Sequence, residues 1–95
     1  MSELLPEQSE IVSRLTAEKE EALAYFFSLV RERLKRIVNF RLDYRLNGRV
    51  SESDVLQDTY VRAAQRLDSY LEKPKMPFFV WLRLEVQQQL SLIHI

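Results

Sequence analysis

Glycine is almost absent from this chain: Gly48 is the only one among 95 residues, and only three prolines accompany it. A β-sheet protein needs many tight turns, and these two residues supply most of them. Their scarcity therefore favours long helices joined by few connections. A chain of this length buries roughly 60–65% of its unfolded surface, enough for one modest core. We expect a single all-α domain.

Apolar residues recur at three- and four-residue steps from about Ala22 onward, which predicts a long amphipathic helix. This helix should end near residues 44–48, because Asn47 and Gly48 suit a left-handed C-terminal cap. A shorter, more charged helix should precede it, starting after Pro6 and lying against the body or fraying. The apolar positions of the long helix are Leu23, Phe26, Phe27, Val30, Leu34, Ile37, Val38 and Leu42.

Two further helices follow in the pattern. Ser51 and Ser53 are alternative N-caps for a helix that runs to about Tyr70. The stretch 72–77 holds two prolines among charged residues and cannot continue that helix. Pro77 suits the first turn of a last helix. The apolar side of this last helix carries Phe78, Trp81, Leu82, Val86, Leu90 and Ile93.

The predicted fold is a compact all-α bundle of three main helices plus a short N-terminal helix. Residues 1–20 form an acidic arm or helix, and residues 21–95 form the helical domain. The chain stops inside an apolar pattern at residues 92–95, without a C-cap or a polar tail. We therefore expect a fragment of a longer protein.

Composition excludes several classes of function. The chain has no cysteine, so it has neither a disulfide framework nor a thiolate metal site. His94 is the only histidine, which excludes paired-imidazole metal sites and argues against serine–histidine catalysis. No glycine-rich phosphate loop is present, and no apolar run approaches the roughly 20 residues of a membrane span. We expect a cytoplasmic, non-enzymatic protein without a cofactor.

The net charge is zero, but the charges are unevenly distributed. Residues 1–20 carry five acids against two bases, whereas residues 21–50 carry seven bases against three acids. An acidic arm therefore precedes a basic helix, and the neutral total hides both. The basic face is either an ordinary solvated surface or a surface for an anionic partner. Its bases are Arg31, Arg33, Lys35, Arg36, Arg41, Arg45 and Arg49.

Three polar residues gather at the start of the third predicted helix. Spacings of three and four place Asp54, Gln57 and Asp58 on one helical face. Such a face offers acceptors to a basic partner. Acids are also common in any first helical turn, where they favour the helix dipole, so a solvated helix start explains the pattern equally. As metal ligands, Asp54 and Asp58 alone make a weak site.

Aromatic residues cluster at the start of the last helix, close in sequence to cations. A helix buries one side only, so inward-facing Phe78 and Trp81 would leave Phe79 partly outward. Exposed rings beside cations suit single-stranded DNA, because bases stack on rings and phosphates meet the cations. The alternative is that all three rings belong to the core. The neighbouring cations are Lys73, Lys75 and Arg83.

The order of these pieces resembles region two of bacterial RNA polymerase sigma factors of the extracytoplasmic-function class. Residues 54–63 are similar to the family's acidic-Leu-x-Gln-Glu-x-Phe-x-Arg-Ala helix, and residues 77–82 to its Pro-Phe-x-x-Trp-Leu motif before the promoter-reading helix. The likeness covers roughly residues 20–94. Two features depart from the family: Asp58 replaces the usual glutamate, and residues 87–89 are glutamines where arginines are frequent.

The resemblance implies two binding surfaces. The first would dock on the clamp helices of the β′ subunit of core RNA polymerase, through Asp54, Gln57, Asp58 and, one turn further, Arg62. The second would read the promoter's minus-ten element as a melted, single-stranded non-template DNA strand, with Trp81 holding the helix from the core. Candidate DNA contacts are Lys73, Lys75, Phe79, Arg83 and Gln87. Whether an anti-sigma factor masks these surfaces stays open.

Two other functions remain as alternatives. The chain would also fit a helical protein-interaction adaptor with no DNA role, in which acids and aromatics form an ordinary binding surface. A small helix-turn-helix repressor would read residues 51–70 as its DNA-binding pair of helices. That stretch shows one helical pattern with no turn in its middle, which disfavours the repressor.

Overall fold

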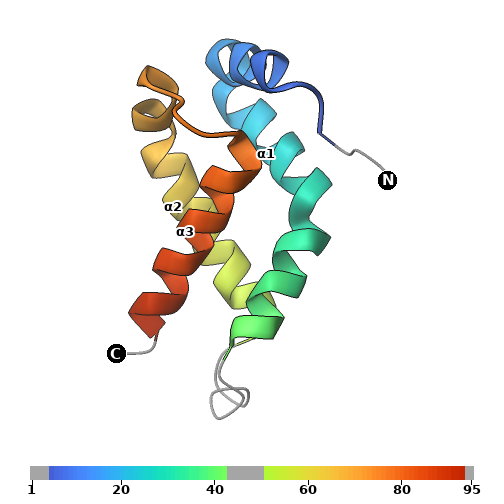
Figure 1. The fold of residues 1–95 in the computed structure, drawn as a ribbon, viewed down its shortest axis with the longest axis vertical. Coiled ribbons are helices and arrows are strands. Elements are labelled where there is room, and N and C mark those ends of the chain that lie inside the picture. The colour runs from blue at the N-terminus through green and yellow to red at the C-terminus, as the bar shows by residue number, and fades with distance from the viewer. Residues whose placement is uncertain (1–4, 43–50, 94–95) are drawn as a thin grey trace.

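The computed structural model describes residues 5–42 and 51–93. Three helices contain nearly all of these residues: α1 (Gln8–Arg41), α2 (Glu52–Glu72) and α3 (Phe78–Ile93). They pack against one another as a bundle, and in the view of Figure 1 α3 crosses in front of α2, with the main part of α1 to the right of both. No strand occurs among the described residues. The all-α prediction is confirmed.

The separate N-terminal helix of the prediction is not present as an element of its own. Residues 8–17 are the first segment of α1, which continues through a kink where Glu18 and Lys19 have non-helical backbone angles. Figure 1 shows this segment crossing the end of the bundle at a steep angle to the rest of α1. Ile11 and Leu15 are buried in the common core, so the acidic segment packs against the body.

The long helix ends earlier than the sequence predicts. Leu42 is the C-cap of α1 and has an extended backbone, with its N–H donating to the Val38 carbonyl at 2.7 Å. Its side chain is buried in the core, as the apolar periodicity predicts, although its backbone is no longer helical. The predicted ending at 44–48, with the Asn47-Gly48 cap, lies outside the described residues.

The two other helix starts follow local hydrogen bonding. Of the two candidate caps, Ser51 is the N-cap of α2, and its hydroxyl accepts from the Asp54 N–H at 3.1 Å. Pro77 lies one residue before α3, and its carbonyl accepts the first helical hydrogen bond, from the Trp81 N–H. Because proline lacks an N–H, it loses no hydrogen bond at this position.

The predicted apolar faces meet in one core. From α1, every residue of the predicted stripe is buried except the half-buried Ile37. Aromatic rings fill the end of the core near the α2–α3 loop, where Tyr70 stacks on Trp81 at 4.6 Å between ring centroids and Phe26 meets Phe78 edge-on at 6.0 Å. Trp81 is therefore a core residue, as predicted.

Gln8 joins all three helices through its side-chain amide. The Oε1 atom accepts from the Phe78 N–H at 3.0 Å, which caps the start of α3. The Nε2 atom donates to the Tyr70 hydroxyl at 2.9 Å, and this hydroxyl donates to the Met76 carbonyl at 2.6 Å. Burial raises the pKa of Tyr70, and the hydrogen bond from Gln8 partly offsets that rise. The first segment of α1 therefore holds the α2–α3 loop in place.

Candidate functional site

A groove of about 480 Å³ runs between α1 and α3. The helical steps of α1 bring its wall residues onto one face, and α3 contributes two residues one turn apart. None of the described residues that line the groove is acidic. Four guanidinium groups and two aromatic rings thus share one open surface. The lining residues are Arg33, Arg36, Ile37, Phe40, Arg41, Phe79 and Arg83.

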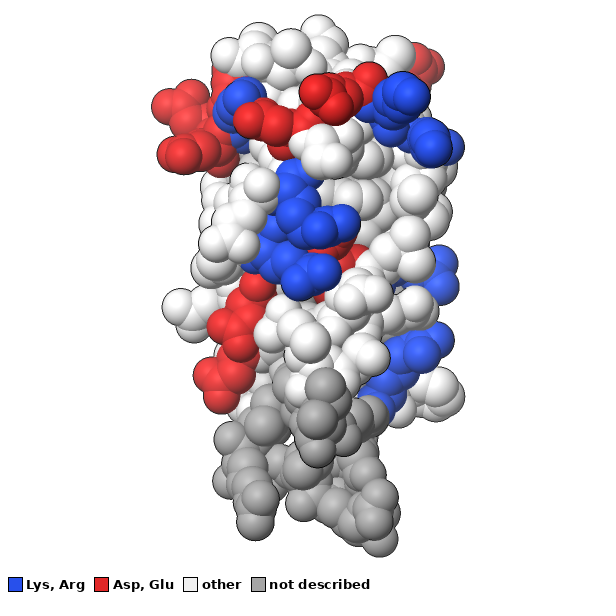
Figure 2. All heavy atoms as spheres, turned by 90° about the vertical axis from the view of Figure 1, so that its left-hand side faces the viewer, with Lys and Arg blue, Asp and Glu red and all other residues white. Residues whose placement is uncertain are grey.

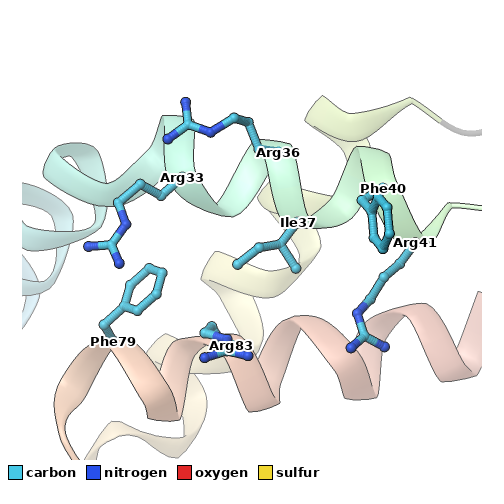
Figure 3. Close-up of a pocket in the computed structure, with 7 residues that line it drawn as sticks. All are labelled: Arg33, Arg36, Ile37, Phe40, Arg41, Phe79 and Arg83. Atoms are coloured by element: carbon cyan, nitrogen blue, oxygen red, sulfur yellow. The ribbon is translucent and has the colours of Figure 1, made fainter.

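The groove positions its cations and rings in distinct ways. The Arg33 guanidinium lies over the Phe79 ring, with its central carbon 3.9 Å from the ring centroid. Figure 3 shows this pair at one end of the groove, with Arg41 reaching from α1 toward α3 at the other. Phe40 is 90% exposed, although apolar side chains of this size are costly to leave in water. Exposed aromatic surface among cations suits an anionic partner that carries flat apolar groups.

The predicted DNA contacts divide among three places. Phe79 and Arg83 both line the α1–α3 groove, and Phe79 is half-buried, as predicted. Lys73 and Lys75 are exposed in the α2–α3 loop and line no described cavity. Gln87 lies at a different depression between α2 and α3, beside Trp81 and the Glu85 carboxylate. The structure therefore brings together only two of the five candidates.

The predicted polymerase contacts lie at the start of α2. Asp54, Gln57 and Asp58 are all exposed, which is what a docking surface requires. Gln57 also borders a depression of about 300 Å³ between α1 and α2, which the Phe27 and Tyr60 rings line. Figure 2 shows acidic side chains along one side of this face, beside a central group of cations, and further acidic side chains among cations across its top. Three of the four candidates thus share one accessible surface.

Arg62, the fourth candidate, forms an ion pair inside the domain. Its Nε donates to the Glu85 carboxylate at 2.8 Å, and the Arg66 Nε donates to the other carboxylate oxygen at 3.1 Å. Glu85 is only 4% exposed, so this acid depends on both arginines for its hydrogen bonds. Arg62 therefore ties α2 to α3 in this structure, and its role at a polymerase interface stays a prediction.

Sequence reasoning placed Arg33 on the basic face and Ile37 in the apolar stripe, but it missed Phe40 and the pairing of Glu85 with two arginines, although the signals existed. Arg33, Ile37 and Phe40 recur at helical steps of four and three, which places an apolar ring on the basic face. Glu85 stands alone as an acid in an apolar helix, and Arg62 and Arg66 are one turn apart in the preceding helix. An isolated acid and two arginines in register are the pattern of a buried ion pair.

Two further kinds of site are not found in the described ranges, 5–42 and 51–93. No three His, Cys, Asp or Glu side chains there converge as metal ligands. None of the three helices has the length and apolar character required to cross a membrane.

The fold and the groove together define a small all-α domain with a cationic, aromatic surface on one side and an acidic helix start on another. Comparison with protein-family models, curated proteins and solved structures finds no match to this chain.

Proposed function

We propose that this chain is the region-two domain of a bacterial transcription initiation factor similar to the extracytoplasmic-function sigma factors. In this proposal the start of α2 binds the β′ clamp helices of core RNA polymerase. The α1–α3 groove, together with the α2–α3 loop, binds the melted non-template strand of the minus-ten promoter element. The domain acts by binding and has no enzymatic role.

The observation that carries the proposal is the composition of the α1–α3 groove. Single-stranded DNA binds where cations follow the phosphates and flat side chains meet the bases. Arg41 and Arg83 are exposed cations on facing helices, and Phe40 and Phe79 supply rings beside them. Because Phe79 lies within the motif that resembles the family's and Arg83 follows it directly, the groove and the resemblance support the same function.

The separation of the two surfaces also supports this function. The acidic residues Asp54 and Asp58 lie in the first two turns of α2 and do not line the α1–α3 groove. A factor that binds polymerase and DNA at once needs surfaces that do not share residues. The opposite charges of the two surfaces further favour different partners, because each repels the other's ligand.

The two alternatives fare differently. The helix-turn-helix repressor requires a turn within residues 51–70, but α2 is continuous from Glu52 to Glu72. The protein-interaction adaptor accounts for the acids of α2 and leaves the cationic groove without a role. Binding of single-stranded DNA to the groove separates the adaptor from the initiation factor.

The DNA half of the proposal is tested by fluorescence anisotropy with the full chain and a labelled single-stranded oligonucleotide at low salt. We expect weak binding that falls as salt rises, because cation–phosphate contacts release counterions. Arg83→Gln should lower the affinity and reduce the salt slope by about one. Arg31→Gln makes the same charge change outside the groove and serves as the matched control.

Two results would contradict the assignment of the groove. One is equal weakening by Arg83→Gln and Arg31→Gln, which would mean that total charge alone governs binding. The other is an absence of any binding by the unaltered chain at low salt, which would leave the adaptor as the better reading.

A further inference from the structure

Phe79 does not present a free ring to the groove. The Arg33 guanidinium covers it, with 3.9 Å between the guanidinium carbon and the ring centroid. Phe79 itself packs against the buried core, whereas Arg33 is exposed. Figure 3 shows the guanidinium reaching from α1 across to the ring on α3. The two side chains thus form a pair in which arginine is the outer member.

This pairing changes which residue meets a base. A base that stacked directly on the covered ring would have to displace the guanidinium and lose the cation–π attraction. A guanidinium is planar, however, and because Arg33 is exposed, the part of its plane that the ring does not cover is accessible to a base. Arginine planes accept stacked bases as aromatic rings do. The ring beneath holds Arg33 in one orientation, which reduces the entropy lost when a base binds.

We propose that Arg33, held in place by Phe79, is the surface on which an unpaired base of the bound strand stacks. Arg41 and Arg83, which line the same groove, contact the flanking phosphates. This inference rests on the proposed function, since it names the stacking residue of the same single-stranded DNA site. It assigns to Phe79 the role of a positioning residue that acts through Arg33.

The test compares two labelled strands of equal length and equal phosphate number, one with thymine bases and one with abasic sugars. The ratio of their affinities isolates the contribution of the bases. The unaltered chain should favour the thymine strand by about tenfold, because stacking of one base is worth that order of effect. Arg33→Lys retains the positive charge and removes the plane, so it should abolish the preference while the affinity for the abasic strand stays unchanged.

Two further variants make the test specific. Arg36→Lys makes the same substitution in the same groove at a residue that lies over no ring among the described residues, and it should leave the preference intact. Phe79→Leu keeps an apolar side chain against the core and removes the ring beneath Arg33, so it should lose the preference as Arg33→Lys does. Circular dichroism melting checks that each variant folds.

The outcomes separate this inference from the proposed function. If the unaltered chain prefers thymine and Arg33→Lys retains that preference, Arg33 is not the stacking surface and the function stands. If only Phe79→Leu loses the preference, the ring itself stacks on the base and the inference is overturned. If the unaltered chain binds neither strand, the proposed function is overturned and the inference falls with it.

Discussion

The amide of Gln8 offers the sharpest test of how the fold holds its α2–α3 loop. Gln8→Ala removes the acceptor for the Phe78 N–H and the donor to the Tyr70 hydroxyl. A side-chain cap contributes about 0.5–2 kcal/mol, and a neutral hydrogen bond about 1 kcal/mol. These atoms are only partly buried, so water replaces part of the loss. We expect a fall of about 2 kcal/mol in the free energy of unfolding.

Thermal and urea denaturation followed by circular dichroism measure this change. For a domain of this size a loss of 1 kcal/mol lowers Tm by about 4–8 °C, so the melting temperature should fall by about 10 °C. Gln65→Ala is the matched control, because Gln65 is exposed on α2 and makes no described hydrogen bond. Its stability should stay within about 0.5 kcal/mol of the unaltered chain. Equal stability of the two variants would refute the bridging role of Gln8.

Three other perturbations test the packing between helices. Glu85→Gln should destabilise the domain by about 1–3 kcal/mol in urea melts, since it leaves the partly buried Arg62 without its charge partner. Glu18→Gln, at an exposed ion pair, is the control, and an equal loss of stability in the two variants would contradict a stabilising role of the Arg62–Glu85 pair. Ser51→Ala should cost about 1 kcal/mol in the same assay, and Ser53→Ala about nothing, because only the first caps α2. The raised pKa of Tyr70 means that its stabilising contribution is complete below about pH 10 and is lost as pH rises through the folded-state pKa. In a titration of tyrosinate absorbance with rising pH, Tyr70→Phe should therefore lack one phenol that ionises later than the others. An unchanged titration curve would contradict the raised pKa of Tyr70.

The helices and the core follow from local pattern, which is why they could be predicted. Three- and four-residue steps identified the buried faces of α1 and α3, and Ser51 and Pro77 marked two helix starts. The apolar steps are interrupted by charged residues between Leu15 and Ala22, which predicted a break between two helices near residue 20. The structure has a kink at Glu18 and Lys19 within one continuous helix instead. The end at Arg41 was not predicted either, because the apolar steps continue through the buried Leu42, whose backbone is extended.

The candidate site was predictable only where one helix carries it. The outward turn of Phe79 and the exposure of Asp54 follow from single-helix geometry. The groove joins Arg33 to Phe79 across 46 positions of sequence, and its existence depends on how α1 and α3 pack. Residue spacing within one helix cannot predict a contact between residues of two different helices. The pairing of Arg62 with Glu85 also joins two helices, and the sequence shows only its components, a lone acid in α3 and two arginines one turn apart in α2.

The central claim, that the start of α2 binds polymerase, is tested most directly by titrating the labelled full chain with bacterial core RNA polymerase. We expect saturable binding that Asp58→Lys weakens at least tenfold, because it reverses a charge facing a basic partner. Glu72→Lys makes the same type of charge reversal at the exposed far end of α2 and should bind as the unaltered chain does. Equal affinities for all three proteins, or no binding of the unaltered chain, would contradict the claim.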